Sequence, residues 1–174
     1  MGFFSKKITT EKIAESLSGF FDAGYGALVV GLKDTFKDQQ ISIDKEQDKE
    51  LISVSMFAII RAVLTTFGDS PATKNIIGKF QHDVFSQYFK DVEERSKFGE
   101  LFWQRCDEYS KVLNPGNKDL TIQFGQIFCN HFFGKEEDGS HLAMMMFIGG
   151  SFLNQMIETK KFLDEVLLKY ELTV

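Results

Sequence analysis

Residues 51–67 have the sequence LISVSMFAIIRAVLTTF, and the expected architecture follows from this segment. Arg61 is its only charged residue, and apolar side chains would lie on nearly all sides of a helix formed here. A helix that is apolar all round is typical of a protein interior, where other helices surround it. A membrane-spanning helix needs about 20 apolar residues, and this segment is shorter and carries a charge. We therefore interpret it as the central helix of a soluble bundle, with no transmembrane segment.

Helical periodicity continues on both sides of this segment, and no convincing alternation of period two appears. Helices are expected at about residues 10–38, 44–67, 71–92, 98–113, 119–133 and 140–170. The chain has 174 residues, an ordinary size for one domain. The sequence thus predicts an all-α fold, a single-domain helical bundle of about six helices with apolar central helices. The domain is expected to cover residues 1–174, with residues 1–9 as a flexible N-terminus.

Local signals set the expected ends and irregularities of these helices. Residues 68–71, GDSP, indicate a helix stop and restart, with the serine as N-cap and the proline at the first helical position. Gly134 is expected to end the fifth helix. The charged run 93–97 predicts an interruption before the fourth helix begins. Glycines favour a kink or break near Gly24 and a bend at residues 149–150.

The charge and the cysteines exclude several classes of protein. Lys and Arg number 20 and Asp and Glu 25, so the net charge is −5 and no nucleic-acid partner is expected. Cys106 and Cys129 form no C-x-x-C pair and lie in apolar helical patterns, which is typical of reduced thiols in a cytosol. Residues 1–7 include two lysines with no apolar segment after them, so no signal peptide is predicted. We expect a cytoplasmic protein.

The chain is unusually rich in phenylalanine, with 19 Phe against 4 Tyr and 1 Trp. One explanation is an AT-rich genome, whose codons would raise Phe and Lys together. The other is that the rings line an apolar pocket or a groove for a partner. The sequence leaves both explanations open.

Four small residues recur at every fourth position of the first helical region: Gly19, Ala23, Ala27 and Gly31. This spacing places them in one stripe along a helix, where another helix backbone could approach closely. We predict that this helix-packing stripe contacts either a central helix of the bundle or a second copy of the chain.

A second group of residues could bind a small molecule inside the bundle. Arg61 lies among apolar residues, where an unpaired guanidinium would be costly to bury, and Asp22 is the predicted partner of its charge. In the sharper interpretation, Arg61 anchors the head group of an apolar ligand. Met144 and Met145, with His131, complete the candidate ligand-binding residues.

The sequence contains no recognised catalytic constellation, and we assign no catalytic residue, no metal site and no cofactor. His131 is the one histidine expected in the interior, and a hydrogen-bonded core role is favoured over a ligand role. A di-iron bundle needs Glu-x-x-His pairs, and no histidine here has a glutamate three residues before it. No P-loop or nucleophile elbow is present either.

Three functions therefore remain. The sequence favours a non-enzymatic interaction or assembly module that acts as a homodimer, because apolar helix surface is abundant and catalytic groups are not. The alternative is a carrier or sensor that binds a fatty-acyl or other apolar small molecule in the bundle core, with Arg61 as its polar anchor. The third is an enzyme or metal protein that uses His131.

Overall fold

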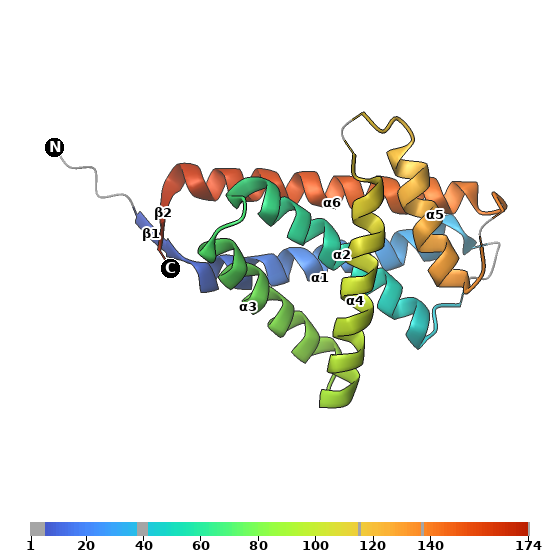
Figure 1. Ribbon diagram of the computed structural model, residues 1–174, viewed down its shortest axis with the longest axis horizontal. Helices are drawn as coiled ribbons and strands as arrows, with labels where there is room; N and C mark the ends of the chain where they lie inside the picture. Colours follow the sequence, from blue (N-terminus) through green and yellow to red (C-terminus); the bar gives the residue numbers. More distant parts are fainter. Residues whose placement is uncertain (1–5, 38–41, 115, 137, 174) are drawn as a thin grey trace.

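The structure is a computed structural model that describes residues 6–37, 42–114, 116–136 and 138–173. In the described part of the chain six helices follow one another, with one short strand before them and one after (Figure 1). The elements are β1 (Lys6–Thr9), α1 (Thr10–Thr35), α2 (Lys45–Phe67), α3 (Pro71–Tyr88), α4 (Val92–Val112), α5 (Leu120–Phe133), α6 (Leu142–Lys169) and β2 (Tyr170–Thr173). The predicted all-α bundle is confirmed.

Helix α2 is the central helix, as its all-round apolar sequence predicts. Every residue from 51 to 60 is buried, and α2 lies in the middle of the bundle against α1 and α6 (Figure 1). Its start is fixed by a capping box, in which Asp44 accepts from the backbone of Gln47 and the Gln47 side chain accepts from the backbone of Asp44. Among the described helices, α2 alone is long and apolar enough to cross a membrane. Of its most apolar 18-residue stretch, 72% is buried inside the fold.

Two glycines allow α5 and α6 to pack backbone against backbone. A Cβ atom placed on Gly125 would lie 2.0 Å from the carbonyl oxygen of Met145, and one on Gly149 would lie 2.1 Å from that of Thr121. Any side chain at either position would therefore collide with the facing helix. The predicted bend at residues 149–150 does not interrupt the helix, because α6 runs without a break from Leu142 to Lys169. Gly149 provides close packing at this point.

Two other positions where the sequence favours an interruption are continuous helix. Helix α1 continues through Gly24 without a break, since the faces on either side of this glycine are held by contacts with α3 and α6. Helix α4 begins at Val92, and the charged run 93–97 forms its first turns, partly exposed and partly half-buried. Asp91 caps these turns by accepting from the backbone N–H of Glu94, and acidic residues near the N-terminus suit the helix dipole.

The two ends of the described chain meet in a small parallel sheet that the sequence analysis missed. Strand β1 pairs with β2 in the register Lys6 to Tyr170 through Thr9 to Thr173, beside the N-terminal end of α1 (Figure 1). Residues 6–9, which were expected to belong to a flexible terminus, thus form a strand, whereas residues 1–5 lie outside the described part. A four-residue strand carries too little periodicity to be recognised from sequence alone.

Aromatic rings fill the middle of the bundle. Phe57 of α2, Tyr109 of α4, Phe124 of α5 and Phe152 of α6 are all buried. Their rings lie in contact, with centroids 4.0 Å apart for Phe124 and Phe152 and 4.5 Å for Tyr109 and Phe124. Much of the phenylalanine of this chain therefore serves a packed core in which four helices share one aromatic cluster.

Candidate functional site

Most of the small-residue stripe of α1 faces away from the bundle. Gly19, Ala23 and Ala27 are exposed, and a Cβ atom on Gly19 would meet no described atom within 4 Å. Only Gly31, at the end of the stripe, is covered, by the ring of Phe147 from α6. The predicted close contact of this stripe with a central helix is therefore limited to Gly31. The contact with a second copy stays a prediction.

A groove runs between this stripe and α6. It has a volume of about 360 Å³, and its α1 side is formed by Phe20, Ala23, Gly24, Ala27, Leu28 and Gly31. Its floor is apolar, with Val54 and Phe152, and its α6 wall adds polar groups, including Gln155. The small side chains of α1 leave this space open, since larger ones would fill it against α6.

One polar atom of the groove has no partner in the described part of the chain. The amide nitrogen Nε2 of Gln155 is buried and donates no hydrogen bond to any described residue. It packs on the backbone of α1, because a Cβ atom on Gly24 would lie 2.2 Å from it. A buried donor without an acceptor carries a free-energy cost, so a group that accepts from Gln155 would relieve it.

The two helices that form the groove also carry exposed apolar side chains outside its lining. On α1, Val30 is 58% exposed, and on α6, Met146 is 53% and Ile157 47% exposed. Gly150 lies between these two residues of α6 and is also exposed. We call the surface made of Gly19, Ala23, Ala27 and Val30 of α1 with Met146, Gly150 and Ile157 of α6 the α1–α6 face. Clustered exposed apolar groups are typical of a surface that another molecule covers.

A buried ion pair forms a second unusual feature, and it joins α2 to α4. The Arg105 guanidinium donates from Nε to Glu50 Oε2 at 2.8 Å and from Nη2 to Glu50 Oε1 at 2.8 Å. Arg105 is 8% exposed and Glu50 4%. This bidentate geometry suits the planar guanidinium and satisfies both carboxylate oxygens, which a buried pair requires.

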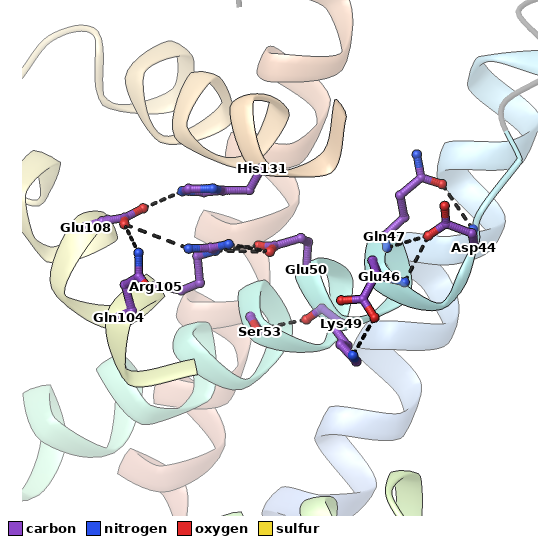
Figure 2. A network of polar contacts seen from close by, with 10 residues as sticks. All are labelled: Asp44, Glu46, Gln47, Lys49, Glu50, Ser53, Gln104, Arg105, Glu108 and His131. Atoms are coloured by element: carbon purple, nitrogen blue, oxygen red, sulfur yellow. Dashed lines mark hydrogen bonds and ion pairs between the residues drawn. The ribbon is translucent and has the colours of Figure 1, made fainter. Parts of the chain in front are cut away.

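The ion pair continues into a row of polar side chains that reaches α5. Figure 2 shows Glu50, Arg105, Glu108 and His131 one after another, from α2 through α4 to α5. Glu108 Oε1 lies 3.8 Å from Arg105 Nη1, and Glu108 Oε2 pairs with His131 Nε2. Gln104 also donates to Glu108, at 3.1 Å. The row thus ties the outer helix α4 to two inner helices by charge as well as by packing.

This row gives the stability of the fold an acid-dependent part. Burial raises the pKa of Glu108, but its hydrogen bonds with His131 and Gln104 and the nearby positive charges lower it by more, so the pKa lies below its ordinary value of 4.5. A carboxylate with a lowered pKa in the folded state stabilises that state above the pKa of the unfolded chain. The contribution is lost as the pH falls through the folded-state pKa.

We therefore predict that Glu108→Gln destabilises the protein at neutral pH and that the difference from the wild type shrinks below about pH 4.5. Urea unfolding at a series of pH values measures this difference. Glu93→Gln is the matched control, because Glu93 lies on the same helix in an exposed pair with Lys97 and should cost little at any pH. A Glu108→Gln penalty that stayed constant down to pH 3 would contradict the role given to the ionised carboxylate.

The surroundings of His131 offer little chemistry beyond this pairing. A surface pocket of about 540 Å³ lies beside it and is lined by Arg105, Asn130, His131, Gly134, Lys135 and Glu136. No serine or cysteine lines this pocket, and among the described residues no three His, Cys, Asp or Glu side chains are placed to hold a metal ion. Cys106 is buried, and burial raises the pKa of its thiol to about 12, so it is a poor nucleophile.

The structure does not bring the candidate ligand-binding residues together. His131 is hydrogen-bonded to Glu108, as the favoured interpretation expects, but it is half-buried beside a surface pocket and does not lie in the core. Met144 and Met145 are buried where α6 packs on α5. Arg61, Met144 and Met145 line none of the pockets described above, nor a third, smaller one between α2 and α4.

The predicted pairing of Arg61 with Asp22 is wrong. The Asp22 carboxylate accepts from Gln87 and from the Tyr88 hydroxyl, both at 3.1 Å, and so joins α1 to α3. Arg61 forms no ion pair within the described ranges, and its Nε atom is buried without a hydrogen bond. Arg61 as a whole is only partly buried, so its side chain keeps some contact with water.

The buried pair of Glu50 and Arg105 was not predicted, although the sequence carries a signal for it. Arg105 follows Phe102 by three residues and precedes Tyr109 by four, so it lies on the apolar stripe of its helix. Glu50 likewise lies four residues before Val54, on the side of α2 that faces the core. A charge of each sign at core positions of different helices is the pattern of a buried ion pair.

Comparison with known proteins gave no match: no protein-family model, no curated protein and no solved structure is similar to this chain at a significant level.

Proposed function

We propose that this protein is a non-enzymatic assembly module that forms a homodimer through the α1–α6 face. The observation that carries the proposal is the exposed stripe of small residues on α1, together with exposed apolar side chains on α6, which packs against α1. Small side chains cost almost no conformational entropy when they are covered, and they let another helix approach closely. A second copy of the chain brings the same surface, which is how most homodimers are built.

The buried cysteines Cys106 and Cys129 lie on different helices, and no C-x-x-C pair occurs, which agrees with a reducing compartment. We propose the cytoplasm as the place where the module acts. The row from Glu50 to His131 then has a structural role. It holds α4 to α2 and α5, the helices against which α4 packs.

Ala23→Arg is predicted to convert the dimer into a monomer. A long charged side chain at the centre of the α1 stripe would hold the two copies apart, and burying its unpaired charge would be costly. Size-exclusion chromatography with light scattering measures the mass, which should fall from twice 19.9 kDa to 19.9 kDa. Val92→Arg is the matched control, since Val92 is an exposed apolar residue on α4, away from the α1–α6 face. A Val92→Arg monomer, or an Ala23→Arg dimer of wild-type affinity, would remove the α1–α6 face from the proposal.

A second candidate function is the binding of an apolar small molecule in the groove between α1 and α6. The volume of about 360 Å³ and the unpartnered amide of Gln155 favour it. No cationic side chain lines the groove and Glu158 does, so a neutral ligand with a hydrogen-bond acceptor would suit it better than a fatty acid. Arg61 would then have no part in binding. The groove is either covered by a second copy or filled by a ligand. A mass measurement on the intact protein distinguishes these two alternatives.

A further inference from the structure

The exposed stripe of α1 extends beyond its small residues at both ends. The spacing of its residues is the same when it is read from either end. Seven exposed residues follow one another at steps of 4, 3, 4, 4, 3 and 4: Lys12, Ser16, Gly19, Ala23, Ala27, Val30 and Asp34. Steps of three and four keep residues on one side of a helix. Ala23 is the centre of the series, with a charge at each end and small or apolar residues between. This order suits a surface that pairs with a reversed copy of itself.

The two charges at the ends lie where the helix dipole of their own chain disfavours them. Lys12 is in the first turn of α1, which attracts negative groups, and Asp34 is in the last turn, which attracts positive ones. Neither side chain forms an ion pair with another residue in the described ranges. In an antiparallel arrangement, each charge would lie beside the opposite end of the neighbouring helix, where both the partner's charge and the partner's dipole favour it.

We propose that two copies of the chain pack their α1 helices antiparallel about a two-fold axis that passes near Ala23. Lys12 of each copy then faces Asp34 of the other, Ser16 faces Val30, and Gly19 faces Ala27. This inference rests on the proposed function and adds the register and direction of the contact. The small residues bring the two backbones close at the centre, and the charge pairs at the ends select the antiparallel direction over the parallel one.

Charge reversal tests the direction. Lys12→Glu and Asp34→Lys are each expected to raise the dissociation constant of the dimer at least about tenfold, because each replaces two attractions by two repulsions. The double variant Lys12→Glu/Asp34→Lys should return close to the wild-type value, since opposite charges face each other again. In a parallel dimer like charges would face each other before and after any of these changes, so the single variants would leave the affinity unchanged.

These variants keep the single chain stable, so unfolding does not explain a lost dimer. Lys12→Glu places a glutamate three residues after the N-cap Thr9 and thus completes the sequence pattern of a capping box. Asp34→Lys places a positive charge in the last turn, which the dipole favours. Thermal unfolding of each variant at a concentration where it is monomeric should show equal or greater stability than the wild-type monomer.

Cysteine cross-linking tests the register. In the proposed arrangement Ala23→Cys forms a disulfide with its own copy, because the two residues meet at the axis within the distance a disulfide spans. Gly19→Cys does not cross-link to itself, since its two copies are about 12 Å apart along the helices, but it does cross-link to Ala27→Cys in a mixture. The wild-type chain, whose two cysteines are buried, is the control.

The two proposals fail in different ways. A wild-type chain that is monomeric at every concentration would overturn both the homodimer and its geometry. A wild-type dimer in which Ala23→Cys does not cross-link, or in which Lys12→Glu leaves the affinity unchanged, would overturn the antiparallel α1 contact alone.

Discussion

Arg105→Met is expected to lower the free energy of unfolding by about 3–5 kcal/mol. The substitution leaves the Glu50 carboxylate buried among α2, α4 and α5 without the guanidinium that both of its oxygens accept from. A buried charge without a partner costs far more than the ion pair itself contributes, because its hydration is not recovered. Urea unfolding followed by circular dichroism measures the loss from the shift of the midpoint.

Two further variants separate the missing partner from lost packing. Glu50→Leu/Arg105→Met replaces both charges by apolar groups of similar size and is expected to stay within about 1 kcal/mol of the wild type. Lys160→Met breaks an exposed pair with Asp164 and should cost less than about 0.5 kcal/mol. If Arg105→Met cost no more than Lys160→Met, the Glu50–Arg105 pair would not be buried as described.

Gly149→Ala is expected to destabilise the fold by about 2–3 kcal/mol or more, because the added Cβ atom would lie 2.1 Å from the carbonyl oxygen of Thr121. The obstacle is backbone, which has no side-chain rotation to move out of the way. Helices α5 and α6 would have to separate. The stacked rings of Phe124 on α5 and Phe152 on α6 would then lose contact with each other. Thermal and urea unfolding measure the effect.

A helical glycine outside the proposed interface is the matched control for this substitution. Gly78→Ala adds the same methyl group at an exposed position of α3, where a Cβ atom would meet no described atom within 4 Å. Alanine favours a helix over glycine by about 0.5–1 kcal/mol, so this variant should be slightly more stable than the wild type. Equal effects of the two substitutions would contradict the close approach of α5 and α6 at Gly149.

Local signals predicted the helices well because local chemistry determines them. The all-round apolar segment 51–67 became the central helix, Ser70 and Pro71 start α3 as expected, and Gly134 ends α5 with a positive φ of 63°. In each case the residues that make the signal are also the ones that make the structure. Gly24 does not break α1, because its intrinsic cost is outweighed by packing on both sides of the helix.

The pairing of charges could not be predicted in the same way. Arg61 and Asp22 both lie in apolar surroundings in the sequence, but the helices that carry them present these residues to different neighbours. Glu50 and Arg105 are 55 residues apart, and only the arrangement of α2 against α4 brings them together. The strands β1 and β2 are similarly distant in sequence. Contacts of this kind depend on the order of helices in space, which amphipathic patterns leave open.

The position of the candidate interface was predicted in part. The stripe from Gly19 to Gly31 follows from sequence spacing, but its exposure does not, because a central helix could have covered it equally well. The positions of Lys12 and Asp34 in the sequence show that the dipole of α1 disfavours both charges. The sequence does not show that both side chains are exposed and form no ion pair in the described ranges.

Native mass spectrometry of the purified protein tests the homodimer most directly, because one spectrum gives the number of subunits and any small molecule retained. The account predicts a species at twice 19.9 kDa without added mass, and a monomer for Ala23→Arg under the same conditions. A monomer that carries a few hundred daltons of extra mass, lost on denaturation, would contradict the homodimer and move the groove between α1 and α6 to the binding of a small molecule.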